Sequence, residues 1–360
     1  MPSPQISFIV PYSHRPWCAD DGRLLGLLGS LACIEGCETL LHVSGPLPAN
    51  LVTPLQQFER LRCLHSDKPA IYSAGQARNE AVAEARGDYL FFVDADLMLH
   101  PQLAQTLCER AEALALQGVQ AFEMYPCIYL SQNVAVTEYD NGALFTEALQ
   151  GLMKGHYSQA EGIALASSCL LVNRHWFNTL GGFDARFVGH GGEDLELIDR
   201  LTRHYPIGQR TDDYALNIKA QHPGDYQGFR RYFSYYALPH LFAGRFLVHQ
   251  WHPRPLTHPY HKLRTGNDNQ LEQMLARSEA ERGPLRGPVV PCNDLGGELP
   301  DFREWTIRLQ EEAGYPVSEY PGLLRWQEGV QRKRPLWRKL RKLYLNPRAF
   351  FRDMFKPTSR

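Results

Sequence analysis

Short apolar runs alternate with helix-like stretches through the first hundred residues of the chain. Four of these runs have the length and the flanking turn residues of buried strands: 6–12, 39–43, 61–65 and 90–93. The apolar content of 24–34 and the Ala, Glu and Arg content of 74–86 predict helices between them. Strands that alternate with helices indicate an α/β fold with a mostly parallel sheet.

Two carboxylates, Asp94 and Asp96, directly follow the last of these strands in the sequence LFFVDADLML. Burying a carboxylate is costly unless a cation, an arginine or a row of backbone donors accompanies it. Ligands of parallel sheets collect at the carboxyl ends of the strands, which is where these two acids fall. The stretch therefore predicts a binding site that supplies a positive partner.

A second acidic cluster follows about a hundred residues later, in LGGFDARFVGHGGEDLELIDRL. Glycine pairs at 181–182 and 191–192 flank a loop and a helix start that carry four polar residues: Asp184, His190, Glu193 and Asp194. Glycine lets a backbone approach a ligand closely, and the N–H groups of a helix start stabilise carboxylates. The cluster predicts a second part of the site, although an ordinary helix with acidic capping is the alternative.

Together the two motifs resemble those of the GT-A glycosyltransferases. The stretch GQARNEAVAEARGDY before FFVDADLML is similar to the ArN and DxD pattern of family-2 enzymes. The stretch GGFDARFVGHGGEDLELIDRL is similar to the GGxD and GGED element of β-1,4-galactosyltransferases, polypeptide N-acetylgalactosaminyltransferases and bacterial chondroitin-type polymerases. The resemblance covers roughly residues 5–255, and it implies a Rossmann-like, nucleotide-sugar-binding GT-A fold with a C-terminal helical extension.

The resemblance also implies roles for the acidic residues. Asp96 would ligate Mn²⁺ or Mg²⁺ at the donor diphosphate, and Asp94 would contact the ribose or the metal and its water shell. Asp194 would be the general base of an inverting transfer, and Glu193 would bind sugar hydroxyls. His190 stands where these families usually have Trp. Acceptor contacts are expected from the same loop region: Asp184, His190, Gly191 and Gly192.

A third metal ligand is expected in the stretch FLVHQWHPRPLTHPYHK, with His249 as the first candidate and His252 as the second. The acidic run that follows the second strand in family-2 enzymes is replaced here by LLHVSGPLP. Recognition of the base would then fall to Asp67 or to backbone groups. Arg78 could also simply cap or pair on its own helix. The expected donor contacts are Pro11, Tyr12, Ser13, Arg15, Asp67, Arg78 and Asp94.

The formal net charge of −1 hides a strongly basic C-terminus. Residues 331–360 contain eleven Lys or Arg and one acid, with apolar residues at helical spacing. Such a segment suits the anionic cytoplasmic leaflet of a membrane, while a terminal helix packed on the domain is the alternative. Nucleic acid is not expected as a partner because the rest of the chain is acidic.

The cellular location and the domain boundaries are predicted from apolar segments and cysteine content. No long apolar span or cleavable leader is seen near the N-terminus, and the eight cysteines are scattered without a CxxC pair, which favours reduced thiols. We expect a cytoplasmic protein that associates peripherally with the inner membrane. The predicted parts are a GT-A domain at 1–264, a connector with a helical extension at 265–330, and a membrane-association tail at 331–360.

The sequence thus predicts a metal-dependent, inverting hexosyltransferase. The donor would be a UDP-hexose or UDP-N-acetylhexosamine, and the acceptor a free or lipid-linked glycan precursor of capsule, O-antigen or lipopolysaccharide, with partner enzymes of a polysaccharide pathway. Two other classes stay open. A catalytically silent sugar-nucleotide-binding assembly factor would bind the donor alone. A haloacid-dehalogenase-type phosphatase shares a DxD motif with VDADLML, but that family carries it on the first strand.

Overall fold

The computed structural model describes residues 5–15, 21–132, 134, 142–156, 158–218, 220, 222–253, 258–277 and 298–324, with isolated positions between 340 and 351. The chain divides into two compact units, residues 1–325 and 326–360. The predicted basic tail at 331–360 therefore lies almost entirely outside the described residues. Among the residues described, no helix has both the length and the apolar content that a bilayer span needs.

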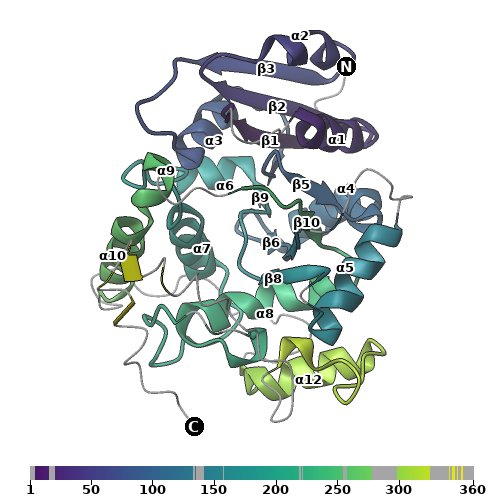
Figure 1. The fold of residues 1–360 in the computed structure, drawn as a ribbon, viewed down its shortest axis with the longest axis vertical. Coiled ribbons are helices and arrows are strands. Elements are labelled where there is room, and N and C mark those ends of the chain that lie inside the picture. Colours follow the sequence, from purple (N-terminus) through teal and green to yellow (C-terminus); the bar gives the residue numbers. More distant parts are fainter. Residues whose placement is uncertain are drawn as a thin grey trace. The chain divides into compact units, whose positions relative to one another are not determined.

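A six-stranded sheet in the order β3-β2-β1-β4-β9-β6 forms the centre of the first unit (Figure 1). The first four strands in that order are parallel, whereas β9 is antiparallel to both β4 and β6. All four predicted strands are confirmed, and so is the mostly parallel α/β fold. The strands are β1 (Ile6–Tyr12), β2 (Cys37–Ser44), β3 (Leu61–Ser66), β4 (Tyr89–Phe92), β6 (Phe122–Met124) and β9 (Leu170–Asn173).

A second, four-stranded sheet has the order β5-β10-β7-β8. Its strands are β5 (Leu97–Leu99), β7 (Cys127–Leu130), β8 (Ala160–Ala164) and β10 (Leu247–His249). The antiparallel pair of β5 and β10 sets Leu97 opposite His249. Because β5 starts one residue after Asp96, this pairing brings the histidine-rich segment beside the DxD motif.

Helices connect and flank the two sheets (Figure 1). They are α1 (Asp21–Ala32), α2 (Ala49–Leu55), α3 (Ala74–Ala83), α4 (Pro101–Gln117), α5 (Ala143–Lys154), α6 (Arg174–Thr179), α7 (Glu193–His204), α8 (Gly228–Phe242), α9 (Pro259–Lys262), α10 (Arg264–Leu275) and α12 (Phe302–Glu312). Two short 3₁₀ helices lie at Pro223–Asp225 and Pro321–Leu323. The helix predicted after the GGED sequence is α7, and both acids lie in its first turn.

The end of α3 differs from the prediction. The helix stops at Ala83 rather than at Arg86. The N–H groups of Glu84 and Ala85 still bond to carbonyls of the last turn. Beyond them, Arg86 N donates to Glu38 Oε1 at 2.6 Å and Gly87 N donates to Ser7 Oγ at 2.8 Å. Side chains of β1 and β2 therefore end the helix early and lead the chain into β4.

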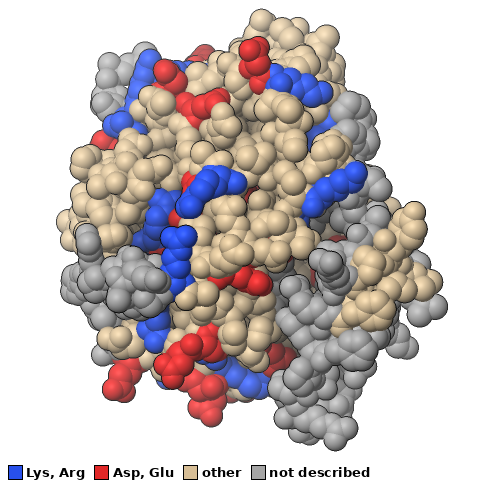
Figure 2. All heavy atoms as spheres, turned by 90° about the vertical axis from the view of Figure 1, so that its left-hand side faces the viewer, with Lys and Arg blue, Asp and Glu red and all other residues tan. Residues whose placement is uncertain are grey.

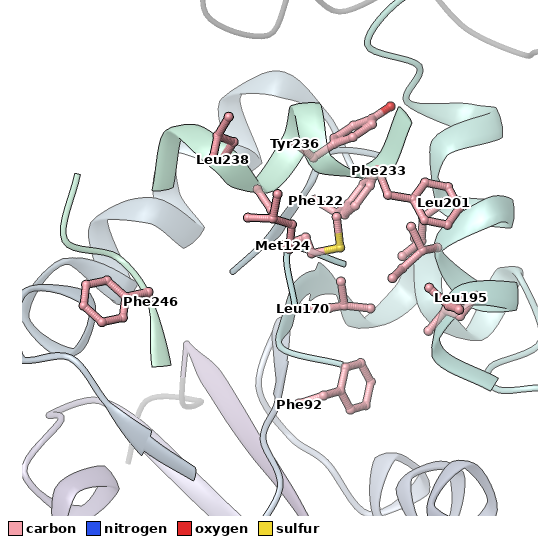
Figure 3. Packing of buried hydrophobic residues seen from close by; sticks show 14 of the residues in the cluster. Phe92, Phe122, Met124, Leu170, Leu195, Leu201, Phe233, Tyr236, Leu238 and Phe246 are labelled. Atoms are coloured by element: carbon pink, nitrogen blue, oxygen red, sulfur yellow. The ribbon is translucent and has the colours of Figure 1, made fainter. Parts of the chain in front are cut away.

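A buried aromatic and aliphatic core holds α7 and α8 against the large sheet (Figure 3). Phe122 of β6 stacks on Tyr236 of α8, with ring centroids 5.2 Å apart. Phe92, the last residue of β4, packs edge-on against Phe183 at 5.2 Å. This packing fixes the strand that precedes Asp94 against the GGFD loop, and it holds the start of α7 close by.

The compact first unit continues past residue 264. Helix α12 packs on α8, where the rings of Tyr235 and Trp305 lie 5.0 Å apart and Thr306 is fully buried. Helix α10 packs on α7. The described part of 265–324 thus folds with the sheets, while the boundary at 264 stays a prediction. Six described cysteines have free thiols: Cys33, Cys37, Cys63, Cys108, Cys127 and Cys169.

Candidate active site

The site lies at the edge of the sheet where β4 ends beside β1. Their parallel register pairs Ile9 with Phe92, so the residues after each strand lie at one edge of the sheet. A cavity of about 270 Å³ opens at this edge. Most of the predicted site residues line it: Pro11, Tyr12, Ser13, Arg15, Arg78, Asp94, Asp96, His190, Gly191, Glu193, Asp194, His249 and His252.

The guanidinium of Arg78 connects the two acidic motifs. Its side chain is only 1% exposed, and it donates to Asp94 Oδ1 at 2.6 Å and to Asp194 Oδ1 at 2.8 Å. Glu193 Oε1 lies 3.9 Å from the same guanidinium. Burial opposes the positive charge, but the facing carboxylates hold the pKa of Arg78 well above its ordinary value. Arg78 is therefore a permanent cation inside the pocket.

Contacts at the start and in the middle of α3 hold Arg78 in place. Ser73 caps the helix and also donates from Oγ to Phe187 O at 3.1 Å. The amide of Asn79 donates to Phe183 O at 2.8 Å and accepts from Phe183 N at 2.9 Å. These bonds tie α3 to the loop that runs from the first glycine pair to α7, so Arg78 and Asp194 keep a fixed relation.

The two acids of the GGED sequence differ in exposure. The Glu193 side chain is 6% exposed and that of Asp194 is 27% exposed. Burial raises the pKa of Glu193 to about 8, with Asp194 adding to the shift and Arg78 opposing it. Burial also raises the pKa of Asp194 against the pull of Arg78. At neutral pH Glu193 is thus mainly a neutral acid, while Asp194 faces the cavity as a stronger base than an ordinary carboxylate.

Asp96 has a different environment from Asp94. Its Oδ2 lies 3.4 Å from His249 Nε2 and 3.0 Å from His252 Nε2. The Gln250 backbone N–H donates to Asp96 O at 3.0 Å, which locks the segment after β10 onto the DxD turn. Burial alone would raise the pKa of Asp96, but the two imidazoles hold it well below its usual range.

The donor set of Asp96, His249 and His252 fits a divalent metal. Their ligand atoms lie within 4.8 Å of one another. This is close to the separation of two atoms that bind one ion at about 2.0–2.2 Å each. His252 Nδ1 lies 3.0 Å from Pro253 O, and because a carbonyl only accepts, this ring donates from Nδ1. Such a contact is the usual way in which a ligating histidine is oriented, with its other nitrogen directed at the metal.

Comparison with protein families matches residues 41–276 to the glycosyltransferase-like family 2. The match spans about two thirds of the chain. The chain belongs to this family. Its mixed α/β fold with a mostly parallel central sheet agrees with the GT-A fold that was predicted from the sequence.

Two curated relatives of this family 2 chain have informative names. Over 254 residues it is 26% identical to the O-antigen biosynthesis protein RfbC of Myxococcus xanthus, a match that covers 61% of the chain and 19% of that protein. Over 167 residues it is 25% identical to polypeptide N-acetylgalactosaminyltransferase 15 of Homo sapiens, a match that covers 44% of the chain and 26% of that enzyme. The chain thus spans about a quarter or less of the length of these relatives.

The cavity of this family 2 domain is also lined by residues that sequence reasoning missed. Ser168 donates from Oγ to Asp94 Oδ2 at 3.2 Å. The rings of Tyr72 and Tyr260 lie 5.9 Å apart and line the cavity with Arg264. Tyr260 in turn packs on the ring of His190 at 5.5 Å. These residues lie in loops or helices that carry no recognisable motif, so nothing in the sequence pattern distinguished them.

Three of the predicted residues do not line the cavity. Asp67 is exposed just after β3. Asp184 accepts from the backbone N–H and the guanidinium of Arg186, which lowers the pKa of Asp184 despite its partial burial. Gly192 lies behind Phe187. The roles proposed for these residues in base or acceptor binding stay predictions.

Two glycines are explained by backbone geometry and packing rather than by a ligand. Gly182 has φ +68°, and a Cβ there would lie 2.6 Å from Asn79 Oδ1. Gly192 has φ +101°, and a Cβ there would lie 2.6 Å from the ring of Phe187. Any larger residue would be strained and would clash at both positions. The GG pairs therefore shape the loop that delivers Glu193 and Asp194.

Proposed function

We propose that this protein is a metal-assisted, inverting glycosyltransferase. It would move a hexose or N-acetylhexosamine from a nucleotide-diphosphate donor, with UDP as the first candidate, to a hydroxyl of a cell-surface glycan precursor. The observation that carries the proposal is that one cavity is lined both by the Asp96, His249 and His252 set and by Asp194. The family match and the name of the O-antigen relative support it.

The donor would bind on the β1 side of the cavity. Pro11 and Tyr12 end β1 and Ser13 follows it, at the edge where ligands of parallel sheets collect, and Arg15 adds a positive charge to the lining. Asp96, His249 and His252 would hold the divalent cation, and two imidazole ligands favour Mn²⁺ over Mg²⁺. When bound, the cation supplies Lewis-acid stabilisation for the leaving diphosphate.

The acceptor would be activated by Asp194. A direct displacement needs a carboxylate within hydrogen-bond reach of the attacking hydroxyl, and the raised pKa of Asp194 makes it a better proton acceptor near neutral pH. Glu193 would hold a sugar hydroxyl, for which a protonated carboxyl offers both a donor and an acceptor. Arg78 would be a positioning residue, since its two hydrogen bonds fix Asp194 relative to Asp94.

The test combines a binding panel with a transfer assay. UDP, GDP, CDP and TDP are each added with Mn²⁺, Mg²⁺ or EDTA, and the melting temperature is measured for the wild type and for Asp96→Ala. We expect one nucleotide to stabilise the wild type only with metal. Transfer from the matching nucleotide sugar is then measured with Asp194→Asn. A donor that binds but is never hydrolysed or transferred by the wild type would instead indicate a silent assembly factor, and phosphorylation of Asp94 would indicate the phosphatase.

Membrane association is proposed from the basic segment 331–360, together with a location at the cytoplasmic face of the inner membrane and partner enzymes of a polysaccharide pathway. Cosedimentation with vesicles of phosphatidylcholine alone or with 30% phosphatidylserine tests this. We expect binding to the anionic vesicles that falls with salt and is lost when 331–360 is removed. Equal binding to both vesicle types would contradict it.

A further inference from the structure

A hydrogen-bonded pair, His190 and the cationic Arg264, forms part of the cavity wall beside the proposed base. Both residues line the cavity, and Arg264 Nη1 lies 2.8 Å from His190 Nε2. A guanidinium carries only donors, so His190 Nε2 must accept this hydrogen bond. The other N–H groups of Arg264 form a planar fork that suits a carboxylate or a phosphate.

Backbone contacts fix this pair relative to Asp194. Gly189 N donates to Tyr72 O at 3.1 Å, and His190 N donates to Tyr260 O at 2.9 Å. The side chain of Asn267, on the same helix as Arg264, donates to Val188 O at 3.0 Å. Only three residues separate His190 from Asp194. His190 is therefore part of the loop that presents the proposed base, and Arg264, the first residue of α10, lies beside it.

Arg264 forms a weak ion pair with Asp268, four residues further along α10. Asp268 Oδ2 lies 3.9 Å from Arg264 Nε, and the arginine side chain is 48% exposed. A long, solvent-exposed ion pair of this kind contributes little stability and yields easily to another anion. Figure 2 shows that Lys and Arg side chains gather across the middle of the face on which α9 and α10 lie. Basic side chains are thus present on the face that carries α10, with some acidic side chains among them.

We propose that His190 and Arg264 bind an anionic substituent, a carboxylate or a phosphate, on the acceptor glycan. The inference rests on the proposed function, because that function puts the acceptor on the Asp194 side of the cavity. An acidic sugar would form charge-assisted hydrogen bonds to the guanidinium fork, whereas a neutral sugar would cover the charge without replacing its water. The pair therefore selects acidic acceptors over neutral ones.

The experiment compares three small sugars in the presence of saturating UDP and Mn²⁺. Methyl β-D-glucuronide carries a carboxylate, glucose 6-phosphate carries a phosphate, and methyl β-D-glucoside is neutral. Binding to the full chain is measured by titration with NMR detection. We expect at least one acidic sugar to bind roughly tenfold or more tightly than the glucoside, and this preference to weaken in high salt. Whichever acidic sugar is preferred identifies the substituent.

Variants assign the preference to the pair. Arg264→Met and Arg264→Gln should lose the preference for acidic sugars, with UDP affinity unchanged. Arg308→Met is the matched control, because Arg308 is also half-exposed and faces an acid four residues on at 4.0 Å, but it lies on α12 outside the cavity lining. Arg264→Gln keeps a donor for His190 and reports on charge if Arg264→Met is unstable.

The outcomes separate this inference from the proposed function. Equal binding of all three sugars, or of none, with UDP bound normally overturns the inference alone. Weaker UDP binding by Arg264→Met, with sugar discrimination intact, assigns Arg264 to the donor diphosphate and also overturns it. Failure of the wild type to bind any nucleotide with metal contradicts the proposed function itself.

Discussion

Asp94 and Asp96 are one residue apart, yet the fold gives them different partners. Asp94 binds the buried guanidinium of Arg78 at 2.6 Å, a cation that is part of the chain. Asp96 faces two imidazole nitrogens at 3.0 Å and 3.4 Å, and the three side chains form a donor set that fits a divalent metal. The comparison teaches that the two acids of this motif have different partners: Asp94 has a fixed counter-ion, and Asp96 has two histidines with which we propose that it binds a cation.

The difference follows from the direction of the chain after β4. Asp94 lies at the edge of the parallel sheet, just after β4, where α3 and the start of α7 meet. Asp96 comes immediately before β5, which leaves that sheet and pairs with β10. Two neighbouring acids thus reach two neighbouring parts of one cavity. The following predictions test this division, from the largest expected effect to the smallest.

Substitution of the proposed base should have the largest effect. Asp194→Asn keeps the shape and a contact with Arg78 but cannot accept a proton, so transfer should fall about 10²–10⁴-fold. Donor binding with metal should be retained. Asp199→Asn on the same helix is the control, because Asp199 pairs with Arg210 away from the cavity lining. Normal transfer by Asp194→Asn would exclude Asp194 as the base.

Removal of the fixed counter-ion should affect both stability and activity. Arg78→Met leaves the carboxylates of Asp94 and Asp194 without their shared cation, and breaking a buried pair costs about 3–5 kcal/mol of unfolding free energy. Urea denaturation measures the loss. Arg200→Met is the matched control on α7, since Arg200 pairs with Glu196 and is 24% exposed. A smaller loss for Arg78→Met than for Arg200→Met would contradict a central role of Arg78.

Asp96→Asn should remove the metal-dependent part of donor binding, whereas Asp94→Asn should keep it. A ligand at about a hundred times its dissociation constant adds about 2.7 kcal/mol of stability, which a thermal shift resolves. For the wild type and for Asp94→Asn, EDTA should abolish this gain. If Asp94→Asn loses the Mn²⁺ effect and Asp96→Asn keeps it, the division between the two acids is reversed.

The local parts of the site were predictable from the sequence. The strand before Asp94 and the helix after Gly192 have strong apolar patterns, and the parallel-sheet rule places the acids at the ligand-binding edge. The partners were not predictable. Arg78 meets Asp194 across 116 residues, a contact set by the strand order and by the bonds of Asn79 to Phe183. No local pattern encodes such a contact.

The same reasoning explains the histidines and the loop residues. The sequence offered His249 and His252 as alternatives, but the β5 and β10 pairing brings both to Asp96. Tyr72 and Tyr260 come together only because the loop before α7 bonds to both. Asp184 was a candidate from its motif, yet Arg186, two residues on, engages it locally. A single sequence thus does not reveal which distant segments pair or which nearby side chain binds a candidate residue first.

The smallest expected effect, when taken for a step of one pH unit, concerns the pH dependence of stability at Glu193. Its pKa is raised by burial to about 8, from 4.5 in the ordinary state, so the folded protein keeps a proton that the unfolded chain has released. The free energy of unfolding should therefore fall as pH rises from about 5 to 8, by at most about 1.4 kcal/mol per pH unit from this group. Asp194, whose pKa burial also raises, adds a slope of the same sign.

Glu193→Gln should flatten this dependence, because the amide does not titrate. Urea denaturation at pH 5, 6, 7 and 8 compares the variant with the wild type and with Glu312→Gln, whose side chain is 65% exposed on α12. The gain in stability of Glu193→Gln over the wild type should be larger at pH 8 than at pH 5, while Glu312→Gln should follow the wild type. A parallel pH profile for Glu193→Gln would mean that Glu193 is ionised in the folded protein. Arg78 would then stabilise the ionised forms of Glu193 and Asp194 by more than burial disfavours them. These acids would differ from Asp96 in the geometry of their partners and not in their charge.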